Sequence, residues 1–171
     1  MDLAYDYWRG DGIAEVIPSI ARFRKYVLQG HDWMAERTLS QELTALEAYF
    51  GNEATIIVAN DCGNIVGYIG IVATADEYPH CAQYDDGTAW FTEGPMVHPD
   101  WRGQGVASRL ITEALDLATQ WDVTQMVMDP TLIIGVDDAA IGMHLMHVFQ
   151  FEKHATDNAI VYTKYLTSAS N

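Results

Sequence analysis

The clearest hydrophobic pattern in the chain runs from residue 107 to residue 121. Its apolar side chains recur at intervals of three and four residues, which predicts a helix with one buried face; they are Ala107, Leu110, Ile111, Ala114, Leu115, Ala118 and Trp121. The stretch 88–98 is mostly apolar and predicts a long strand. Two glycines, Gly103 and Gly105, lie between these elements. The pattern therefore predicts a strand, a glycine-rich loop and a helix in direct succession.

The rest of the chain alternates between strand-like and helix-like patterns. Before the central unit we predict a strand, two helices and an antiparallel hairpin, over residues 3–8, 13–28, 39–50 and 54–59 with 65–73. After a long polar loop at 76–87 and the central unit, we predict a strand, a helix and two closing strands, over residues 123–128, 137–149, 151–155 and 159–166. Thr38 and Gln41 match a capping box, and Pro18 either opens the first helix or kinks it. Because no repeat or linker divides the chain, we expect one domain, 1–171.

Composition narrows the class of protein. Hydrophobic residues make up 49% of the 171 residues, which is typical of a folded domain. No apolar run approaches the ~18 residues of a membrane helix, and the N-terminus lacks the layout of a signal peptide. Cys62 and Cys81 form neither a disulfide framework nor a zinc-binding spacing. We therefore expect a cytoplasmic location, no metal and no membrane partner.

The charge of the chain is strongly acidic. Its 24 Asp and Glu residues outnumber 9 Lys and Arg residues, which gives a net charge of −15. Such a chain repels the phosphates of nucleic acid, so we expect no nucleic-acid partner. Long-range steering would favour a cationic substrate, whereas solubility or adaptation to salt is the simpler explanation.

The glycine-rich loop and the helix after it form an expected anion site. A loop leading into a helix N-terminus leaves backbone N–H groups unpaired, and the helix dipole adds positive potential. Glycine has no Cβ to hold a phosphate away from the backbone. We expect residues 103–108 to hold a phosphate or pyrophosphate, with Arg102 as a charged partner. A salt bridge between Arg102 and Asp100 or another acid is the alternative.

The loop also carries a family signature. Its sequence Arg102-Gly103-Gln104-Gly105-Val106-Ala107 resembles the (Gln/Arg)-x-x-Gly-x-(Gly/Ala) signature of the GCN5-related N-acetyltransferase (GNAT) family. Residues 65–69 resemble the third strand of that family, and residues 96–101 resemble its usual approach to the signature. Residues 145–151 lie where the family often carries Leu-Tyr-x-x-x-Gly-Phe. The order of the predicted elements is similar over nearly the whole chain.

This resemblance implies a GNAT-like α/β fold. The expected sheet is mixed and largely antiparallel, with six to seven strands, about four flanking helices and a splay between strands four and five. The implied donor is acetyl-CoA, whose pantetheine arm would pair with backbone groups of Met96 and Val97. The expected cofactor-binding residues are Met96, Val97, Arg102, Gly103, Gln104, Gly105, Val106, Ala107 and Ser108. Dimerisation is common in the family, but no stretch of this sequence indicates it.

Acetyl transfer to an amine sets two chemical demands. The amine must lose a proton, which costs about 4–5 kcal/mol at pH 7 for an alkyl amine of pKa near ~10.4. Glu93 is the candidate base, because it lies in an apolar strand that leads to the signature. The alternative is a solvated acid on the strand face, or an acid paired with an arginine.

The second demand is departure of the thiolate. The tyrosine that the family often uses as general acid aligns with Met146, whose thioether cannot donate a proton. His144 and His147 lie nearby, and we predict His147 as the acid. A packed or surface histidine is the alternative. The thiolate can also leave unassisted, because protonating a thiol of pKa ~8.5 gains only about 2 kcal/mol near pH 7.

Aromatic and acidic residues indicate an acceptor pocket for an ammonium group; they are Trp33, Tyr78, His80, Tyr84, Asp85, Asp86 and Trp90. Covering of the core is the alternative, especially for Trp90. We expect an N-acetyltransferase that acts on a small-molecule amine or a peptide. The alternative is an acyl-CoA-binding regulatory module with little or no turnover. A different nucleotide-binding α/β protein is disfavoured, because the glycine loop follows a hairpin and not a repeated βαβ unit.

Overall fold

The computed structural model describes residues 2–50, 54–73, 87–121, 123–129, 138–155 and 160–166. Within these ranges the chain forms a seven-stranded sheet in the order β1-β2-β3-β4-β5-β7-β6. The elements are β1 (Ala4–Arg9), η1 (Gly10–Gly12), α1 (Ile13–Val27), α2 (Asp32–Ala35), α3 (Leu39–Phe50), β2 (Thr55–Asp61), β3 (Asn64–Val72), β4 (Thr88–Val97), η3 (Pro99–Trp101), α4 (Val106–Gln120), β5 (Gln125–Met128), α5 (Asp138–Phe149), β6 (Glu152–Ala155) and β7 (Ile160–Tyr165). Apart from the short helices η1, α2 and η3, the order of these elements confirms the predicted one.

Local sequence signals in the first two helices have mixed outcomes. The capping box is confirmed: Thr38 N donates to Gln41 Oε1 at 2.8 Å, and Gln41 N donates to Thr38 Oγ1 at 3.2 Å. Pro18 lies inside α1 and does not open it. Because Pro18 follows the first turn of α1, only one helical bond is lost there. The short helix α2 forms where the pattern predicts only a break.

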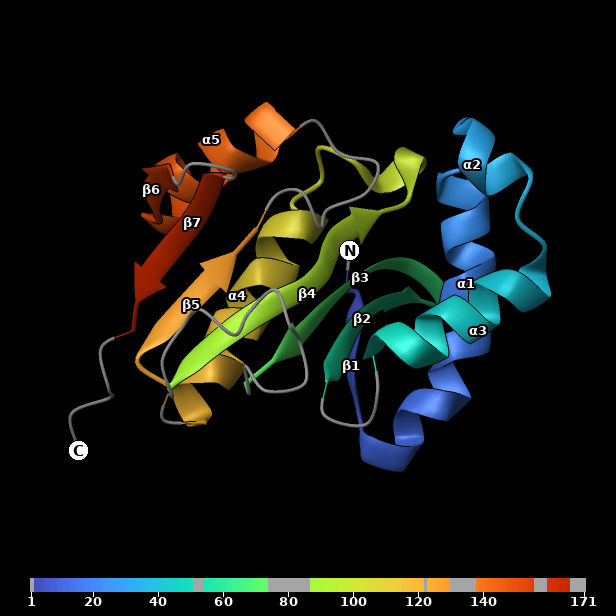
Figure 1. Ribbon diagram of the computed structural model, residues 1–171, viewed down its shortest axis with the longest axis horizontal. Helices are drawn as coiled ribbons and strands as arrows, with labels where there is room; N and C mark the ends of the chain where they lie inside the picture. The colour runs from blue at the N-terminus through green and yellow to red at the C-terminus, as the bar shows by residue number, and fades with distance from the viewer. Residues whose placement is uncertain are drawn as a thin grey trace.

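The sheet is mixed, with one parallel pair of strands. β4 and β5 run parallel, and the other neighbouring strands are antiparallel. β5 pairs with only the first three residues of β4, Thr88, Ala89 and Trp90. The two strands therefore separate toward the C-terminal end of β4 (Figure 1). This arrangement confirms the predicted fold class, including the splay between the fourth and fifth strands.

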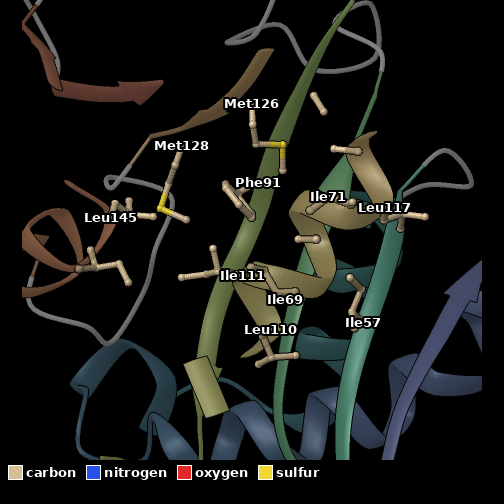
Figure 2. Close-up of a cluster of buried hydrophobic side chains, with 14 of the residues drawn as sticks. Ile57, Ile69, Ile71, Phe91, Leu110, Ile111, Leu117, Met126, Met128 and Leu145 are labelled. Carbon is tan, nitrogen blue, oxygen red and sulfur yellow. The ribbon is translucent and has the colours of Figure 1, made fainter. Parts of the chain in front are cut away.

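Helices cover both faces of the sheet (Figure 1). On one face α4 packs against β2, β3 and β4, where Ile57 and Ile69 meet Leu110 (Figure 2). On the other face α1 and α3 cover the alternate strand residues, such as Ile56 and Tyr68. Because both faces are covered, the central strands read as apolar runs with little polar alternation.

The last third of the chain builds the far edge of the sheet. α5 contacts β6 and β7, and its Leu145 joins the same hydrophobic core as α4, on the side of Met128 (Figure 2). The predicted loop at 76–87 lies, apart from Gly87, outside the described residues. Among the helices that the structure describes, none combines the length and apolarity needed to cross a membrane.

Candidate active site

The N-terminus of α4 is built to hold an anion. Gly105 caps the helix in a left-handed conformation, with φ at 83°, and the first helical bond runs from Arg109 N to Gly105 O at 2.9 Å. The first amides of a helix have no acceptor within it, and here these belong to Val106, Ala107 and Ser108. A Cβ on Gly105 would meet no protein atom within 4 Å. The space in front of these amides is therefore open to a ligand.

A cavity of about 500 Å³ lies at this helix end. It is lined by Val27, Pro95, Met96, Val97, Trp101, Arg102, Gly103, Gly105, Val106, Ala107, Ser108, Ile141 and His144. Eight of the nine residues expected to bind the cofactor thus lie around one space. The ninth, Gln104, lies outside this lining because its exposed side chain turns back and donates to Asp100 O at 2.8 Å.

Arg102 supplies positive charge to the cavity. Its Nε donates to Val97 O at 3.3 Å, which holds the side chain along the end of β4. Among the described residues Arg102 makes no salt bridge with Asp100, the alternative that the sequence left open. The guanidinium therefore keeps donors that suit a phosphate.

A β-bulge in β4 shapes another part of the cavity wall. Tyr68 of β3 pairs with Met96, whereas Gly70 pairs with Glu93, so β4 carries one more residue than β3 in this interval. Gly94 within the bulge has φ at 83°, and a Cβ there would lie 2.8 Å from the carbonyl oxygen of Tyr68. The bulge therefore requires glycine. It lies between Glu93, the predicted base, and Met96, a predicted donor contact.

Glu93 is buried and forms an ion pair with Arg24 of α1. Arg24 is also buried, and its Nε donates to Glu42 Oε1 of α3 at 2.5 Å. Glu93 thus takes the position that the sequence left as the alternative to a base, an acid paired with an arginine. Its role in proton transfer stays a prediction.

The ion pair belongs to a larger buried cluster. Arg24 Nη1 donates to the hydroxyl of Tyr68 at 3.0 Å, and Arg37 Nη1 donates to Glu42 Oε2 at 2.8 Å. Burial raises the pKa of Tyr68 to about 12, despite the opposing charge of Arg24, so this phenol stays neutral near pH 7. Burial also acts to raise the pKa of Glu42, but the hydrogen bonds and charges of Arg24 and Arg37 outweigh it and lower that pKa. The cluster joins α1 and α3 to the strands that carry the bulge.

The two histidines of α5 have different surroundings. His144 lines the cavity, and its Nε2 lies 2.9 Å from Ser108 Oγ. His147, the predicted acid, is exposed and is not among the residues that line the cavity. Met146, at the position of the family tyrosine, packs against the core beneath α4. Of the two, the sequence favours His147 as the acid, whereas the structure places His144 at the cavity; the role of His147 as the acid stays a prediction.

The structure describes only two of the seven residues predicted to form the acceptor pocket. Trp90 is buried with Val72 and Val127. It therefore packs in the core, which was the alternative to a role in the acceptor pocket. Trp33 on α2 is 41% exposed, and the guanidinium carbon of Arg37 lies 5.9 Å from its ring centroid. Five further residues, Tyr78, His80, Tyr84, Asp85 and Asp86, lie outside the described ranges.

The sequence pattern of the Acetyltransferase (GNAT) family matches residues 22–147, which is most of the chain. The chain belongs to this family. The GNAT resemblance of the glycine-rich loop is thereby confirmed, and the protein is a GNAT acetyltransferase that uses acetyl-CoA as donor. No curated protein sequence matches the chain significantly.

Solved structures support the GNAT fold. The PaiA N-acetyltransferase of Thermoplasma acidophilum, in complex with coenzyme A, is 11% identical with a TM-score of 0.64, over 97% of this chain and 100% of that one. The yncA protein of Salmonella typhimurium, with acetyl-CoA, is 15% identical with a TM-score of 0.61, over 100% and 96%. The ribosomal-protein-alanine N-acetyltransferase of Brucella melitensis is 15% identical with a TM-score of 0.63, over 96% and 100%.

The GNAT cavity suits a pyrophosphate-bearing donor, because open space, unpaired amides and Arg102 meet at one helix end. Within the described part of the chain, no three His, Cys, Asp or Glu side chains come close enough to hold a metal ion. Sequence reasoning missed Arg24, although a signal was present. Arg24 follows Ile13, Ile17 and Ile20 on the buried face of α1, and a charge at such a position requires a buried partner.

Proposed function

We propose that this GNAT acetyltransferase moves the acetyl group of acetyl-CoA to a primary amine of a small molecule or a peptide, by direct attack of the amine on the thioester. One observation carries the proposal: a single cavity is walled by the N-terminus of α4 and by the bulged end of β4. The first wall suits a pyrophosphate and the second suits an extended arm. The pyrophosphate and the pantetheine arm of the donor would thus each lie against a suitable wall of the same cavity.

Backbone groups account for most of the proposed donor contacts. The amides of Val106, Ala107 and Ser108 suit the pyrophosphate, and Arg102 adds a charged partner. Beyond Trp90, β4 has no β5 partner among the described residues. Backbone groups on that side of β4 therefore need other partners, and at Met96 and Val97 the amides of a pantetheine arm would provide them.

The acceptor amine must lose a proton before it attacks. We propose Glu93 as the group that accepts this proton, directly or through a water molecule. Its ion pair with Arg24 opposes this role, because a guanidinium stabilises the ionised carboxylate. A matched pair of variants can separate a base from a purely structural acid.

Glu93→Gln and Glu42→Gln each remove one carboxylate from Arg24. Each is expected to lower the free energy of unfolding by about 3 kcal/mol, the cost of breaking a buried ion pair. Only Glu93→Gln is expected to lower kcat, by about 10²-fold, with acetyl-CoA affinity retained. Equal kcat values for the two variants, measured well below their melting temperatures, would remove Glu93 from proton transfer.

A donor-binding module with little turnover is the second candidate function. Met146 at the tyrosine position favours it, since a thioether cannot protonate the departing thiolate. Against it, a CoA thiolate leaves with little help, because protonation gains only about 2 kcal/mol near pH 7. The predicted role of His147 as the acid is tested with His147→Gln, whose kcat should fall if His147 donates that proton.

A screen of amines, read by release of free CoA, tests the proposal. The panel includes polyamines, aminoglycosides, amino acids and peptide N-termini, and the net charge of −15 favours cationic members. Turnover with any amine supports the acetyltransferase, whereas donor binding without turnover across the panel supports the binding module. Turnover only with neutral or acidic acceptors would exclude the preference for cations.

Donor binding has its own test, which needs no acceptor. Acetyl-CoA at ~100 Kd stabilises the folded chain by about 2.7 kcal/mol. For a domain of this size, the melting temperature should rise by roughly 5–10 °C. ATP and NAD should raise it much less. If no acyl-CoA shifts the melting temperature, the proposed function is wrong.

A further inference from the structure

α5 contributes a histidine to the cavity at the end of α4. His144 Nε2 lies 2.9 Å from Ser108 Oγ, and its ring meets the edge of Phe149 at a centroid distance of 5.5 Å. The side chain is half-buried and lines the cavity together with Ile141, its neighbour one turn earlier. A packed ring and a hydrogen bond thus hold the imidazole beside the first turn of α4.

The partner of His144 shows which part of the cavity the imidazole faces. Ser108 is the third residue of α4, so its own amide is one of the unpaired donors at the helix N-terminus. An anion on those amides therefore lies next to the ring. Met96 and Val97, which follow the bulge on β4 and are the proposed contacts of the thioester arm, belong to a different wall of the cavity.

The charged groups of the described lining bear on which ligand the ring can bind. Arg102 is the other charged residue among the described residues of the lining, and no carboxylate is among them. Among the described residues, Ser108 of α4 lies within hydrogen-bond distance of the ring and Phe149 of α5 makes a ring contact with it, and neither carries a charge. His147, one turn further along α5, is exposed. An imidazolium at this position could therefore pair with the donor, because no carboxylate among the described lining residues would compete for it.

We propose that His144 binds the pyrophosphate of the donor as an imidazolium, so that acetyl-CoA affinity falls as pH rises through the titration range of an imidazole. The proposal rests on the proposed function, because it takes acetyl-CoA as the ligand of the cavity. An acidic protein that must hold a polyanion gains from such a cation. His144 is then a donor-binding residue and not the acid at the thiolate.

Calorimetric titration with acetyl-CoA between pH 5.5 and 8.0 tests the proposal. The wild type and His154→Gln, a control at an exposed histidine of β6 that is not among the lining residues, should lose about tenfold more affinity over this range than His144→Gln. The comparison between variants removes the titration of the donor's own phosphates, which is common to all three proteins. Equal slopes for the wild type and His144→Gln would overturn the proposal.

A second ligand identifies the contacted group. Acetyl-pantetheine lacks the pyrophosphate, so the wild type and His144→Gln should bind it equally at every pH. A loss of acetyl-pantetheine affinity in His144→Gln would place the ring at the thioester arm and overturn the proposal.

A measurement on the wild type avoids the risk that a variant does not fold. The NMR ring signal of His144 should change its pH response when acetyl-CoA is added, whereas that of the exposed His154 of β6, which is not among the lining residues, should not. An unchanged response of His144 in the saturated protein would overturn the proposal. Absence of any acetyl-CoA binding by the wild type is a different result, because it would overturn the proposed function itself.

Discussion

Among single residues, Gly105 has the most sharply defined role in the proposed donor site. Its left-handed backbone caps α4, and the space beyond its Cα is open. Gly105→Ala should lower the free energy of unfolding by about 1–2 kcal/mol, because a Cβ is strained in this conformation. The same methyl group would enter the space proposed for the pyrophosphate. Acetyl-CoA affinity, measured by calorimetry, should therefore fall at least about tenfold.

Gly63 offers a matched control for Gly105. Its φ is 85°, close to the 83° of Gly105, and a Cβ there also meets no atom within 4 Å. Gly63 lies between β2 and β3, away from the residues that line the donor cavity. Gly63→Ala should lose similar stability but keep its acetyl-CoA affinity. Equal donor affinity in the two variants would mean that the loop does not hold the pyrophosphate.

Single residues also show which parts of the site could be predicted from the sequence and which could not. The loop residues could be predicted because adjacent residues create the anion site, through the helix N-terminus and its glycines. The partner of Glu93 could not be predicted, because Arg24 reaches it only after α1 packs on the sheet. The choice between His144 and His147 likewise depends on how α5 is rotated against α4.

At the scale of elements, the capping box at the start of α3 is the local signal that the structure confirms most directly. Thr38→Ala removes the side-chain acceptor of the Gln41 amide and should cost about 1 kcal/mol. The melting temperature, followed by circular dichroism, should fall by about 2–4 °C. Ser40→Ala is the control, because Ser40 is the exposed second residue of α3 and alanine has a high helix propensity. A melting temperature for Thr38→Ala equal to that of Ser40→Ala would contradict a stabilising cap.

The buried ion cluster joins α1 and α3 to β3 and β4, and it should make the free energy of unfolding depend on pH in the acidic range. The pKa of Glu42 lies below its ordinary value of 4.5 in the folded chain. A carboxyl group whose pKa is lower in the folded than in the unfolded chain stabilises the fold at pH values above its unfolded pKa. This contribution is lost as pH falls from about 4.5 through the pKa of the folded chain. The stability difference between the wild type and Glu42→Gln, about 3 kcal/mol at pH 7, should therefore shrink below pH 4.5. Urea unfolding at pH 7 and pH 3.5 measures it.

Glu47 provides the control for this prediction, because it is an exposed glutamate on the same helix. Glu47→Gln should change stability by less than about 0.5 kcal/mol at either pH. If Glu42→Gln stays equally far below the wild type at both pH values, the carboxylate of Glu42 does not carry the acid dependence.

The order of the helices and strands could be predicted from the sequence, because the spacing of hydrophobic residues and the turn residues are both properties of short stretches of chain. The strand and helix order matches the structure, and the splay followed from the GNAT resemblance. The bulge could not be predicted, because it depends on the register between β3 and β4. The short helix α2 was missed because four residues are too few to show a period.

At the scale of the whole molecule, the negative net charge of the protein repels the negatively charged donor that we propose. The chain carries −15, and the proposed donor carries several negative phosphate charges. The local site is nonetheless favourable for the proposed donor, because the N-terminus of α4 and Arg102 both line the cavity. Distance separates the two effects: repulsion acts as the donor approaches, whereas the contacts of the site act only after it arrives.

Salt should therefore change association and dissociation in a defined way. The Debye length falls from about 30 Å at 0.01 M to about 8 Å at 0.15 M salt, so long-range repulsion is screened first. The association rate of acetyl-CoA, measured by stopped flow, should rise several-fold over this range, and the dissociation rate should also rise as site contacts weaken. Acetyl-pantetheine, which carries no phosphate, should show neither change. If the association rate of acetyl-CoA falls with salt, the local cations steer the donor, and the acidic surface does not slow its capture.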